Sequence, residues 1–203
     1  MSASHWDAAY QRHGAGAVSW FEQSPEMSLR LIEACGLARD AAMVDVGGGA
    51  SRLTLGLLER GFSRLTVLDV SATALALARE PCGASAERVT WVTGDARDWQ
   101  PTTAFALWHD RAVFHFLTEA ADRARYLAIL RASLRPGGFV VMATFAPDGP
   151  ERCSGLPVQR YDAAMLGDLL GAPFALRDAL RHAHHTPGGA VQNFTYARFQ
   201  RIE

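Results

Sequence analysis

The pattern of hydrophobic and polar positions predicts strands and helices in alternation. Short apolar runs predict five strands, at residues 43–46, 65–70, 89–93, 105–109 and 139–145. Two further strands are predicted at about 174–184 and 190–201. They are joined at Pro187-Gly188-Gly189, and so close a connection favours an antiparallel pair. The alternation is typical of an α/β fold with a doubly wound, mostly parallel sheet of seven strands in which the last is antiparallel.

Capping residues mark the ends of several predicted helices. Ser71 precedes an alanine-rich helix that Pro81 ends, and Asp162 precedes a helix that ends near Gly171. The Pro- and Gly-rich loop at residues 146–160 is long enough to line a site. We expect one domain over residues 1–203, because a chain of this length supports one well-buried core. Its predicted parts are a helical cap at 1–40, a ligand-binding core at 41–145, and a loop, helix and hairpin at 146–203.

The composition excludes several chemistries. All 20 basic residues are arginine, so the chain contains no lysine. A chain without lysine cannot form a Schiff base, which excludes pyridoxal-phosphate enzymes and imine-forming aldolases. It also lacks the lysine of ordinary P-loop ATPases and protein kinases. The net charge of −1 gives no overall basic field, so we expect no nucleic-acid partner.

Cysteine and histidine spacing gives no reason to expect a metal. The three cysteines are widely spaced and form no CxxC pair. His182, His184 and His185 are close in sequence, but on a strand the third points away from the first two. No apolar run approaches the length of a membrane span, and the first ten residues carry no apolar signal core. We therefore expect a cytoplasmic protein without a metal or a membrane partner.

Acidic residues and glycines gather at the predicted carboxyl ends of the strands, where parallel sheets bind ligands. Asp45 precedes the three glycines at 47–49, which allow a ligand to approach the backbone closely. Asp69 ends the next strand and can accept hydrogen bonds from both hydroxyls of a ribose. Asp95 can accept from an adenine amino group, while the backbone of Ala96 can serve a ring nitrogen. The three carboxylates could instead be helix caps or turn residues.

Two classes of adenosine ligand compete for such a site. A nicotinamide Rossmann domain would carry a third glycine at position 52, which is Arg52. Asp45 would also repel a pyrophosphate, whereas the same carboxylate suits an α-ammonium group. A ligand with amino-acid, ribose and adenine parts satisfies all these positions, and S-adenosylmethionine (SAM) is that ligand.

The motifs resemble those of the class I SAM-dependent methyltransferases over roughly residues 40–145. Val44-Asp45-Val46-Gly47-Gly48-Gly49 is similar to the first motif of the family, with Ser51 in place of its last glycine. Leu68-Asp69-Val70-Ser71 is similar to the second motif and Gly94-Asp95-Ala96 to the third. Leu134-Arg135-Pro136-Gly137-Gly138-Phe139 resembles the turn before the fifth strand. The resemblance implies that SAM is the cofactor and S-adenosylhomocysteine (SAH) the product.

The N-terminal segment narrows the resemblance within the family. His5-Trp6-Asp7 and Ser19-Trp20-Phe21 are similar to the cap of small protein-lysine methyltransferases, and also to thiol and tellurite-resistance methyltransferases. The Asn/Asp-Pro-Pro-Tyr motif of enzymes that methylate nucleic-acid amino groups is absent after the fourth strand. The expected acceptor is a nitrogen, sulfur or oxygen of a small molecule or of an exposed protein side chain.

Three groups are candidates for the catalytic step. Methyl transfer is an in-line displacement, for which the protein mainly supplies alignment, although an amine or thiol acceptor must also lose a proton. We expect Asp110 first, then His109 and His115, to position the acceptor or take its proton. Each has a structural alternative, as a turn cap for Asp110 and as a partly buried histidine for the other two.

The remaining site predictions concern binding. The expected cofactor contacts are Trp20, Asp45, Gly47, Gly48, Gly49, Asp69, Val70, Asp95, Ala96 and His109. The expected acceptor contacts are Phe21, Arg111, Phe114, Arg152 and Arg160. The arginines would bind a carboxylate, their alternative being solvated surface charge. Two other functions stay open, a nicotinamide-dependent oxidoreductase and a SAM-binding module without catalysis. The sequence predicts no oligomeric state.

Overall fold

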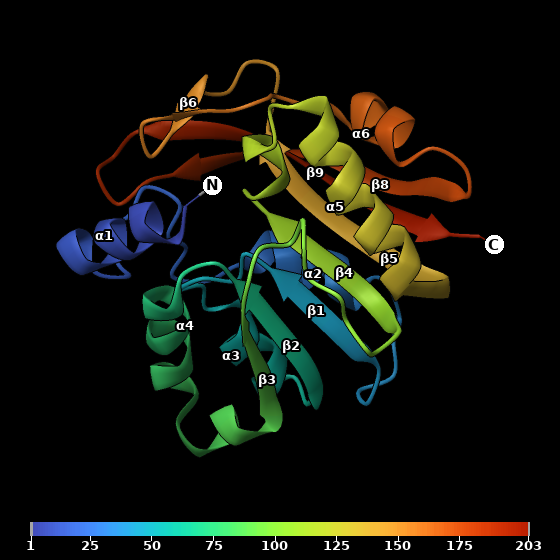
Figure 1. Cartoon of the computed structure of the whole chain (residues 1–203), viewed down its shortest axis with the longest axis horizontal. Coiled ribbons are helices and arrows are strands. Elements are labelled where there is room, and N and C mark those ends of the chain that lie inside the picture. Colours follow the sequence, from blue (N-terminus) through green and yellow to red (C-terminus); the bar gives the residue numbers. More distant parts are fainter. Residues whose placement is uncertain (1, 203) are drawn as a thin grey trace.

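The computed structural model describes residues 2–202 and contains the seven-stranded sheet that the sequence predicts. Its strands lie in the order β3-β2-β1-β4-β5-β9-β8 (Figure 1). Their bounds are Ala42–Val46 (β1), Arg64–Asp69 (β2), Val89–Thr93 (β3), Phe105–Arg111 (β4), Leu134–Phe145 (β5), Phe174–His185 (β8) and Val191–Arg201 (β9). Strands β1 to β5 pair in parallel, whereas β9 pairs antiparallel with both β5 and β8. The last strand is therefore inserted between two strands that run in the opposite direction.

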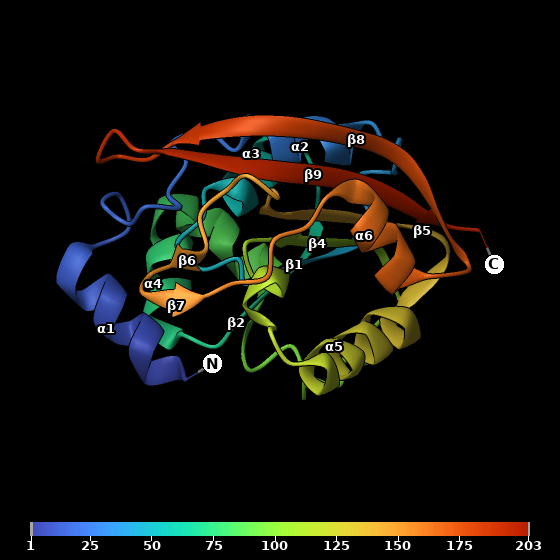
Figure 2. The same ribbon diagram turned by 90° about the horizontal axis from the view of Figure 1, so that it is seen from above.

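Helices cover both faces of this sheet (Figure 2). The α-helices are Ala3–His13 (α1), Glu26–Glu33 (α2), Leu53–Glu59 (α3), Ala72–Arg79 (α4), Ala120–Ser133 (α5) and Ala163–Leu170 (α6). Glu80–Arg88 and Phe114–Phe116 form 3-10 helices. One core contains Leu29 of α2 and Leu53 of α3, and the opposite core contains Leu130 of α5 and Leu166 of α6. This division into two cores is the doubly wound arrangement that the sequence predicts.

Strand alternation assigns neighbouring residues to opposite cores. Met43 of β1 packs in the core beneath α2 and α3, and the next residue, Val44, packs in the core beneath α5. The same alternation divides Val140 from Val141 on β5. A parallel sheet buried on both faces needs such continuous apolar runs, which is why the runs were readable in the sequence.

The predicted caps are confirmed at two helices. The Ser71 hydroxyl accepts a hydrogen bond from the Ala74 backbone N–H at 3.0 Å, and the Asp162 carboxylate accepts one from Met165 at 2.8 Å. These side chains satisfy backbone donors that the first helical turn leaves without an intrahelical partner.

The structure corrects two element boundaries. Strand β4 extends to Arg111, two residues beyond the predicted end, and β5 already begins at Leu134. The loop predicted at residues 146–160 contains a small hairpin, formed by Arg152–Cys153 (β6) and Leu156–Pro157 (β7). The extension of β4 and the hairpin both place additional residues beside the carboxyl ends of the strands, since Arg111 and Cys153 line the cavity there. Among residues 2–202, no helix is long and apolar enough to cross a membrane.

Candidate active site

A glycine loop connects β1 to α3, and its backbone packs closely against neighbouring side chains. Gly47 has a φ of +66°, and a Cβ at this position would lie 1.9 Å from Cγ2 of Val113. A Cβ on Gly48 would lie 2.5 Å from Val67 and 2.7 Å from Oδ2 of Asp45. Neither contact is tolerable, so this loop requires glycine for its conformation and for its packing.

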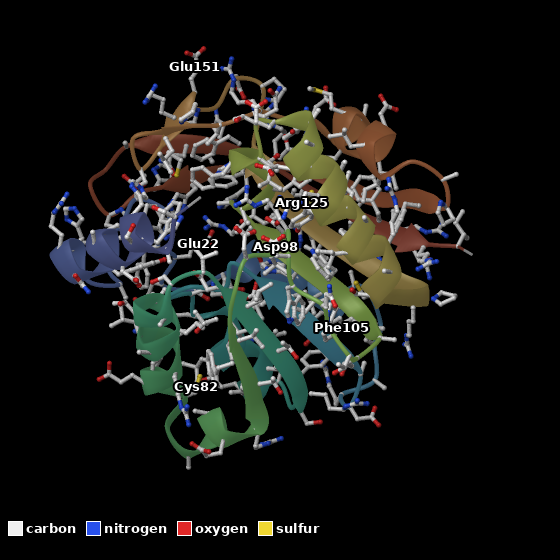
Figure 3. The ribbon with its side chains drawn as sticks, viewed as in Figure 1. Glu22, Cys82, Asp98, Phe105, Arg125 and Glu151 are labelled. Atoms are coloured by element: carbon white, nitrogen blue, oxygen red, sulfur yellow. The ribbon has the colours of Figure 1, made fainter. Side chains whose placement is uncertain are left out.

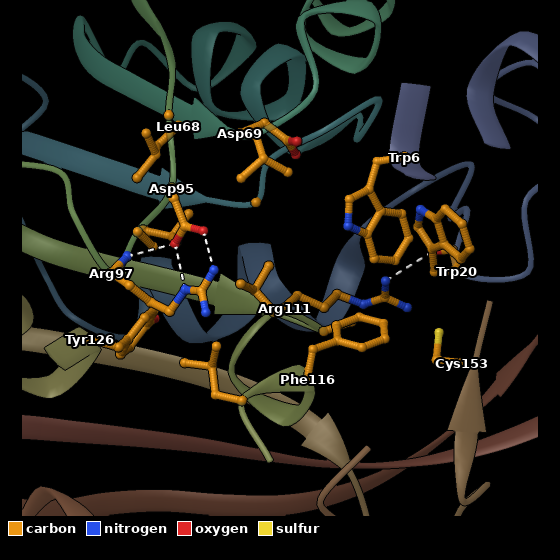
Figure 4. A pocket seen from close by; sticks show the side chains of 18 of the residues that line it. Trp6, Trp20, Leu68, Asp69, Asp95, Arg97, Arg111, Phe116, Tyr126 and Cys153 are labelled. Carbon is orange, nitrogen blue, oxygen red and sulfur yellow. Dashed lines mark hydrogen bonds and ion pairs between the residues drawn. The ribbon is translucent and has the colours of Figure 1, made fainter. Parts of the chain in front are cut away.

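A cavity of about 730 Å³, which is open to solvent, lies over the carboxyl ends of the strands, and we call it the main cavity because the predicted site residues line it. Figure 4 shows Asp69 and Asp95 at one end, Trp6, Trp20, Phe116 and Cys153 at the other, and Arg111 between them. Gly47, Val70 and Ala96 also line it. The structure thus brings together the residues that the sequence predicted from three separate strand ends.

The acidic end of the cavity contains two carboxylates with different surroundings. Asp69 accepts a hydrogen bond from the Ser71 backbone N–H at 2.8 Å, and burial raises its pKa to about 6. Asp95 forms a double contact with Arg97, whose Nη2 lies 2.6 Å from Oδ2 and whose Nε lies 2.9 Å from Oδ1. Burial alone would raise the pKa of Asp95, but the hydrogen bonds from Arg97 lower it. Arg97 was not predicted, and its position two residues after Asp95 gave no signal.

The opposite end of the cavity is aromatic. The ring centroids of Trp6 and Trp20 lie 5.4 Å apart, those of Trp6 and Phe116 lie 5.2 Å apart, and both pairs meet edge to face. The Trp20 indole N–H donates to the Tyr10 hydroxyl at 3.0 Å, which fixes its ring over the cavity. Cys153 of β6 contributes a buried thiol, and burial raises its pKa to about 12. We define Trp6, Trp20, Phe116 and Cys153 as the aromatic end.

A second cavity of about 500 Å³ shares Tyr10, Trp20, Gly47 and Arg111 with the first. Arg111 is held at three points. Its Nε donates to the Tyr196 hydroxyl at 2.9 Å and lies 3.1 Å from Oε2 of Glu22, and its Nη1 donates to the Trp20 carbonyl at 2.9 Å. Its buried Nη2 finds no hydrogen-bond partner within residues 2–202. The structure therefore does not support the interpretation of Arg111 as solvated surface charge.

Asp45 gives the second cavity a charge of opposite sign. Its Oδ1 lies 2.7 Å from Nδ1 of His109, while its buried Oδ2 is without a partner in the described part of the chain. A buried ionic or polar atom left unsatisfied is costly, so such atoms frequently mark the position of a ligand. Asp45 and Arg111 both line the second cavity, and each has one buried atom without a partner among the described residues. Their opposite charges match the ammonium and carboxylate groups of an α-amino acid. The residues present therefore fit the amino-acid end of SAM.

Asp110, the first-ranked catalytic prediction, does not reach either cavity. Its side chain is fully buried and accepts hydrogen bonds from the backbone N–H groups of Val113 (3.1 Å) and Phe114 (3.2 Å) and from the Tyr126 hydroxyl (2.5 Å). The cause is strand alternation, since Asp110 faces the core beneath α5 whereas His109 and Arg111 face the other side. This position matches the structural alternative, a carboxylate that holds the turn after β4.

His115 and Phe114 are likewise part of the core. His115 is fully buried, accepts a hydrogen bond from the Phe145 backbone N–H at 3.3 Å, and has its pKa lowered by burial to about 3. Phe114 packs against Tyr126 and Tyr161. Of the aromatic residues at this turn, Phe116 lines the main cavity, because the 3-10 helix directs it back toward Trp6.

The other two arginines lie outside both cavities. Arg152 donates to the carbonyl of Gly155 within its own hairpin. Arg160 donates to the Gly149 carbonyl and pairs with exposed Glu151, which lies at the outer edge of the molecule (Figure 3). Phe21, by contrast, lines the second cavity. Residues 2–202 contain no group of three or more histidine, cysteine or acidic side chains placed to hold a metal ion.

Comparisons with known proteins match this chain to methyltransferases. The family model described as a methyltransferase domain matches residues 43–138. EEF1A lysine methyltransferase 2 of Danio rerio is 29% identical over 157 residues, which cover 69% of this chain and 66% of that protein. The chain thus spans slightly less than two thirds of this relative, and the aligned part covers only 33% of the Mus musculus protein of the same name.

Two solved structures share the fold over nearly the whole chain. The N-methyltransferase NodS from Bradyrhizobium japonicum WM9, in complex with SAH, has a TM-score of 0.72 and 17% identity, and covers 98% of this chain and 100% of its own. The 1,6-didemethyltoxoflavin-N1-methyltransferase of Burkholderia thailandensis, with 1,6-didemethyltoxoflavin and SAH bound, has a TM-score of 0.70 and 24% identity, and covers 99% of this chain and 85% of its own. In strand order, motifs and the matched methyltransferase domain, this chain is similar to the class I SAM-dependent methyltransferases.

Proposed function

We propose that this protein transfers the methyl group of SAM to a nucleophilic nitrogen, sulfur or oxygen of a small molecule or an exposed protein side chain. One observation carries the proposal. A single cavity connects the carboxylates at the ends of β2 and β3 with the aromatic end, and Arg111 lies between the two (Figure 4). This arrangement offers one place for an adenosine and another for an acceptor, with the reacting atoms between them.

The proposed cofactor contacts follow from the chemistry of each side chain. Asp69 accepts hydrogen bonds from the ribose hydroxyls, and Asp95 and Ala96 contact the adenine. Asp45 Oδ2 receives the α-ammonium group. Arg111 Nη2 receives the carboxylate of SAM rather than that of an acceptor, because Arg111 lines the same cavity as Asp45.

SAM, when bound, supplies an activated methyl group, so the chain's own residues act mainly by alignment. The rings of Trp6, Trp20 and Phe116 exclude water around the acceptor. None of Asp110, His109 and His115 is among the residues that line the aromatic end. We therefore expect an acceptor that arrives deprotonated or loses its proton to water, with no side-chain base.

The relatives are consistent with both a small-molecule acceptor and a protein side-chain acceptor. EEF1A lysine methyltransferase 2 is named for a protein lysine, and the toxoflavin enzyme was solved with a small heterocycle. A small-molecule acceptor is favoured here, because the aromatic end lies beneath α1 and the β6–β7 hairpin. His5 Nε2 of α1 and the Ser154 hydroxyl of this hairpin lie 3.3 Å apart.

Calorimetric titration of the purified protein with SAM, SAH and NAD tests the cofactor. We expect micromolar SAM and SAH binding, abolished in Asp69→Ala and retained in Asp148→Ala, an exposed aspartate on the C-terminal side. Release of SAH is then measured against pooled metabolites, thiols and a proteome extract. Micromolar NAD binding without SAM binding would refute the proposal. SAM binding without SAH release in the presence of any of these acceptor mixtures would favour a SAM-binding module without catalysis.

A further inference from the structure

Three buried polar side chains form a continuous hydrogen-bonded chain beside the glycine loop. Nδ1 of His109 lies 2.7 Å from Asp45 Oδ1, and Nε2 of the same ring lies 2.9 Å from the Ser28 hydroxyl. The exposed fractions are 7% for Asp45, 3% for His109 and 1% for Ser28. The three residues come from β1, β4 and α2, and all of them line the second cavity.

The direction of these hydrogen bonds follows from what each group can do. An ionised carboxylate only accepts, so of the two neutral tautomers of His109 this contact selects the one that carries its hydrogen on Nδ1 and donates it to Asp45. Nε2 is then an acceptor, and it receives the Ser28 hydroxyl hydrogen. Ser28 thereby fixes the tautomer and the rotation of the ring, as outer partners do for histidines that serve metals.

The hydrogen bonds among Asp45, His109 and Ser28 leave one oxygen of Asp45 available for a ligand. Oδ1 is occupied by His109, while Oδ2 is buried and finds no partner among the described residues. Oδ2 lies 2.7 Å from the place where Gly48 would carry a Cβ, so it faces the glycine loop. A carboxylate in this position needs a cation or a further donor, because an ionised group buried with half its acceptors unsatisfied is expensive.

We propose that His109 and Ser28 are positioning residues that hold the Asp45 carboxylate in place and turn its Oδ2 toward the α-ammonium group of SAM. This inference rests on the proposed function and adds two residues to it. Sequence analysis placed His109 at the site as a catalytic candidate and as a cofactor contact. The geometry instead points to a role for the imidazole beside the proposed position of the α-amino acid of SAM, away from the aromatic end of the cavity. Ser28 carried no sequence signal, because it lies within an amphipathic helix in the predicted cap.

The test compares two ligands that differ in the amino-acid end. SAH carries the α-amino acid, whereas 5′-methylthioadenosine has the same adenosine and sulfur without it. We expect His109→Leu to weaken SAH binding by about 10- to 100-fold, the range for a lost hydrogen bond to a charged group. Its affinity for methylthioadenosine should stay within about twofold of the wild type. Ser28→Ala should show a smaller loss in the same direction.

Two further variants control for damage to the fold. His109→Asn retains an N–H at the place of Nδ1, so it should restore most of the SAH affinity that His109→Leu loses. Ser133→Ala removes a buried hydroxyl that donates to the Ile129 carbonyl on α5, far from either cavity, and should change neither ligand's affinity. Dissociation constants are measured by calorimetry, with a thermal melt of each unliganded variant.

The possible results separate this inference from the function on which it rests. A selective loss of SAH affinity in His109→Leu, with rescue by His109→Asn, supports the positioning role. Equal losses for both ligands, or none, overturn it while leaving the methyltransferase proposal intact. If His109→Leu does not fold, the ratio of the two affinities in Ser28→Ala decides. A wild-type protein that binds neither ligand overturns the proposed function, and the positioning role with it.

Discussion

Replacing Asp110 distinguishes a structural carboxylate from a catalytic one. In Asp110→Ala, two backbone N–H groups and the Tyr126 hydroxyl lose their buried acceptor. Each such group left unsatisfied costs about 1–3 kcal/mol, so the variant should lose about 3 kcal/mol or more. For a domain of about 200 residues, each kcal/mol lowers the Tm by about 2–4 °C, which gives a decrease of roughly 6–12 °C.

Asp110→Asn is the matched variant. Its amide oxygen can accept from both N–H groups and its amide nitrogen can donate to the Tyr126 oxygen, so we expect a loss of only about 1 kcal/mol. Burial raises the pKa of Asp110 to about 6, above its ordinary 3.8, so the folded state binds this proton more tightly than the unfolded state. Wild-type stability should therefore fall relative to Asp110→Asn as the pH rises from about 4 to 6.

The assay combines thermal melts with SAH titration and methyl transfer to whichever acceptor the screen identifies. Asp110→Asn should retain the Tm, SAH affinity and turnover within a few degrees and a few fold. If Asp110→Asn kept the wild-type stability and SAH affinity but its turnover fell more than 100-fold, the structural interpretation of Asp110 would be refuted. This result would reinstate Asp110 as a catalytic group.

Three further results are expected. Gly47→Ala should weaken SAH binding at least tenfold, because its Cβ would lie 1.9 Å from Val113, whereas Gly137→Ala, with a φ of +74° but open space, should not affect binding in the same titration. SAH affinity should decrease as the pH falls from 7 to 5, because Asp69, whose pKa is raised to about 6, then gains a proton and ceases to be an anionic acceptor; an affinity independent of pH over this range would contradict its contact with the ribose. Cys153, whose pKa is about 12, should react with iodoacetamide at pH 8 more than 100-fold more slowly than free cysteine, as peptide mass mapping can measure. Alkylation at the rate of an exposed thiol would show that the aromatic end opens to solvent.

The sequence predicted the sheet because a parallel sheet leaves a strong local signal. Each strand buried on both faces is a continuous apolar run, and each run ends in the residues that a ligand needs. The β8–β9 hairpin was predictable from its connection at 187–189. The bounds of β4 were not, since the run ends in the polar residues His109-Asp110-Arg111, and burial of polar residues depends on partners distant in sequence.

The site was predictable where the backbone positions it and unpredictable where a side chain's direction matters. Asp45, Asp69 and Asp95 meet because the carboxyl ends of parallel strands meet. Strand β4 continues to Arg111, two residues beyond the end that the sequence predicts, and the alternation of its side chains decides whether Asp110 or its neighbours face the proposed cofactor. Cys153 lines the cavity and Arg152 does not, because the two alternate on a short strand that the sequence did not reveal. Tyr10 and Trp6 reach the site from a helix, and their positions depend on how α1 docks.

The insertion of β9 between β5 and β8 has a consequence for how the chain reaches this fold. The residues that pair with β5 lie at 194–200, about fifty positions further along, so synthesis must proceed past this segment before β5 can pair on its second side. Until then β5 presents an unpaired edge that includes Val140, Val141 and Met142, and such edges pair readily with other chains. Sheets completed by distant segments also fold slowly. During synthesis this protein is therefore most exposed to misassociation at the strand that its own C-terminal segment later covers, and chaperone protection of the nascent chain matters most at that stage.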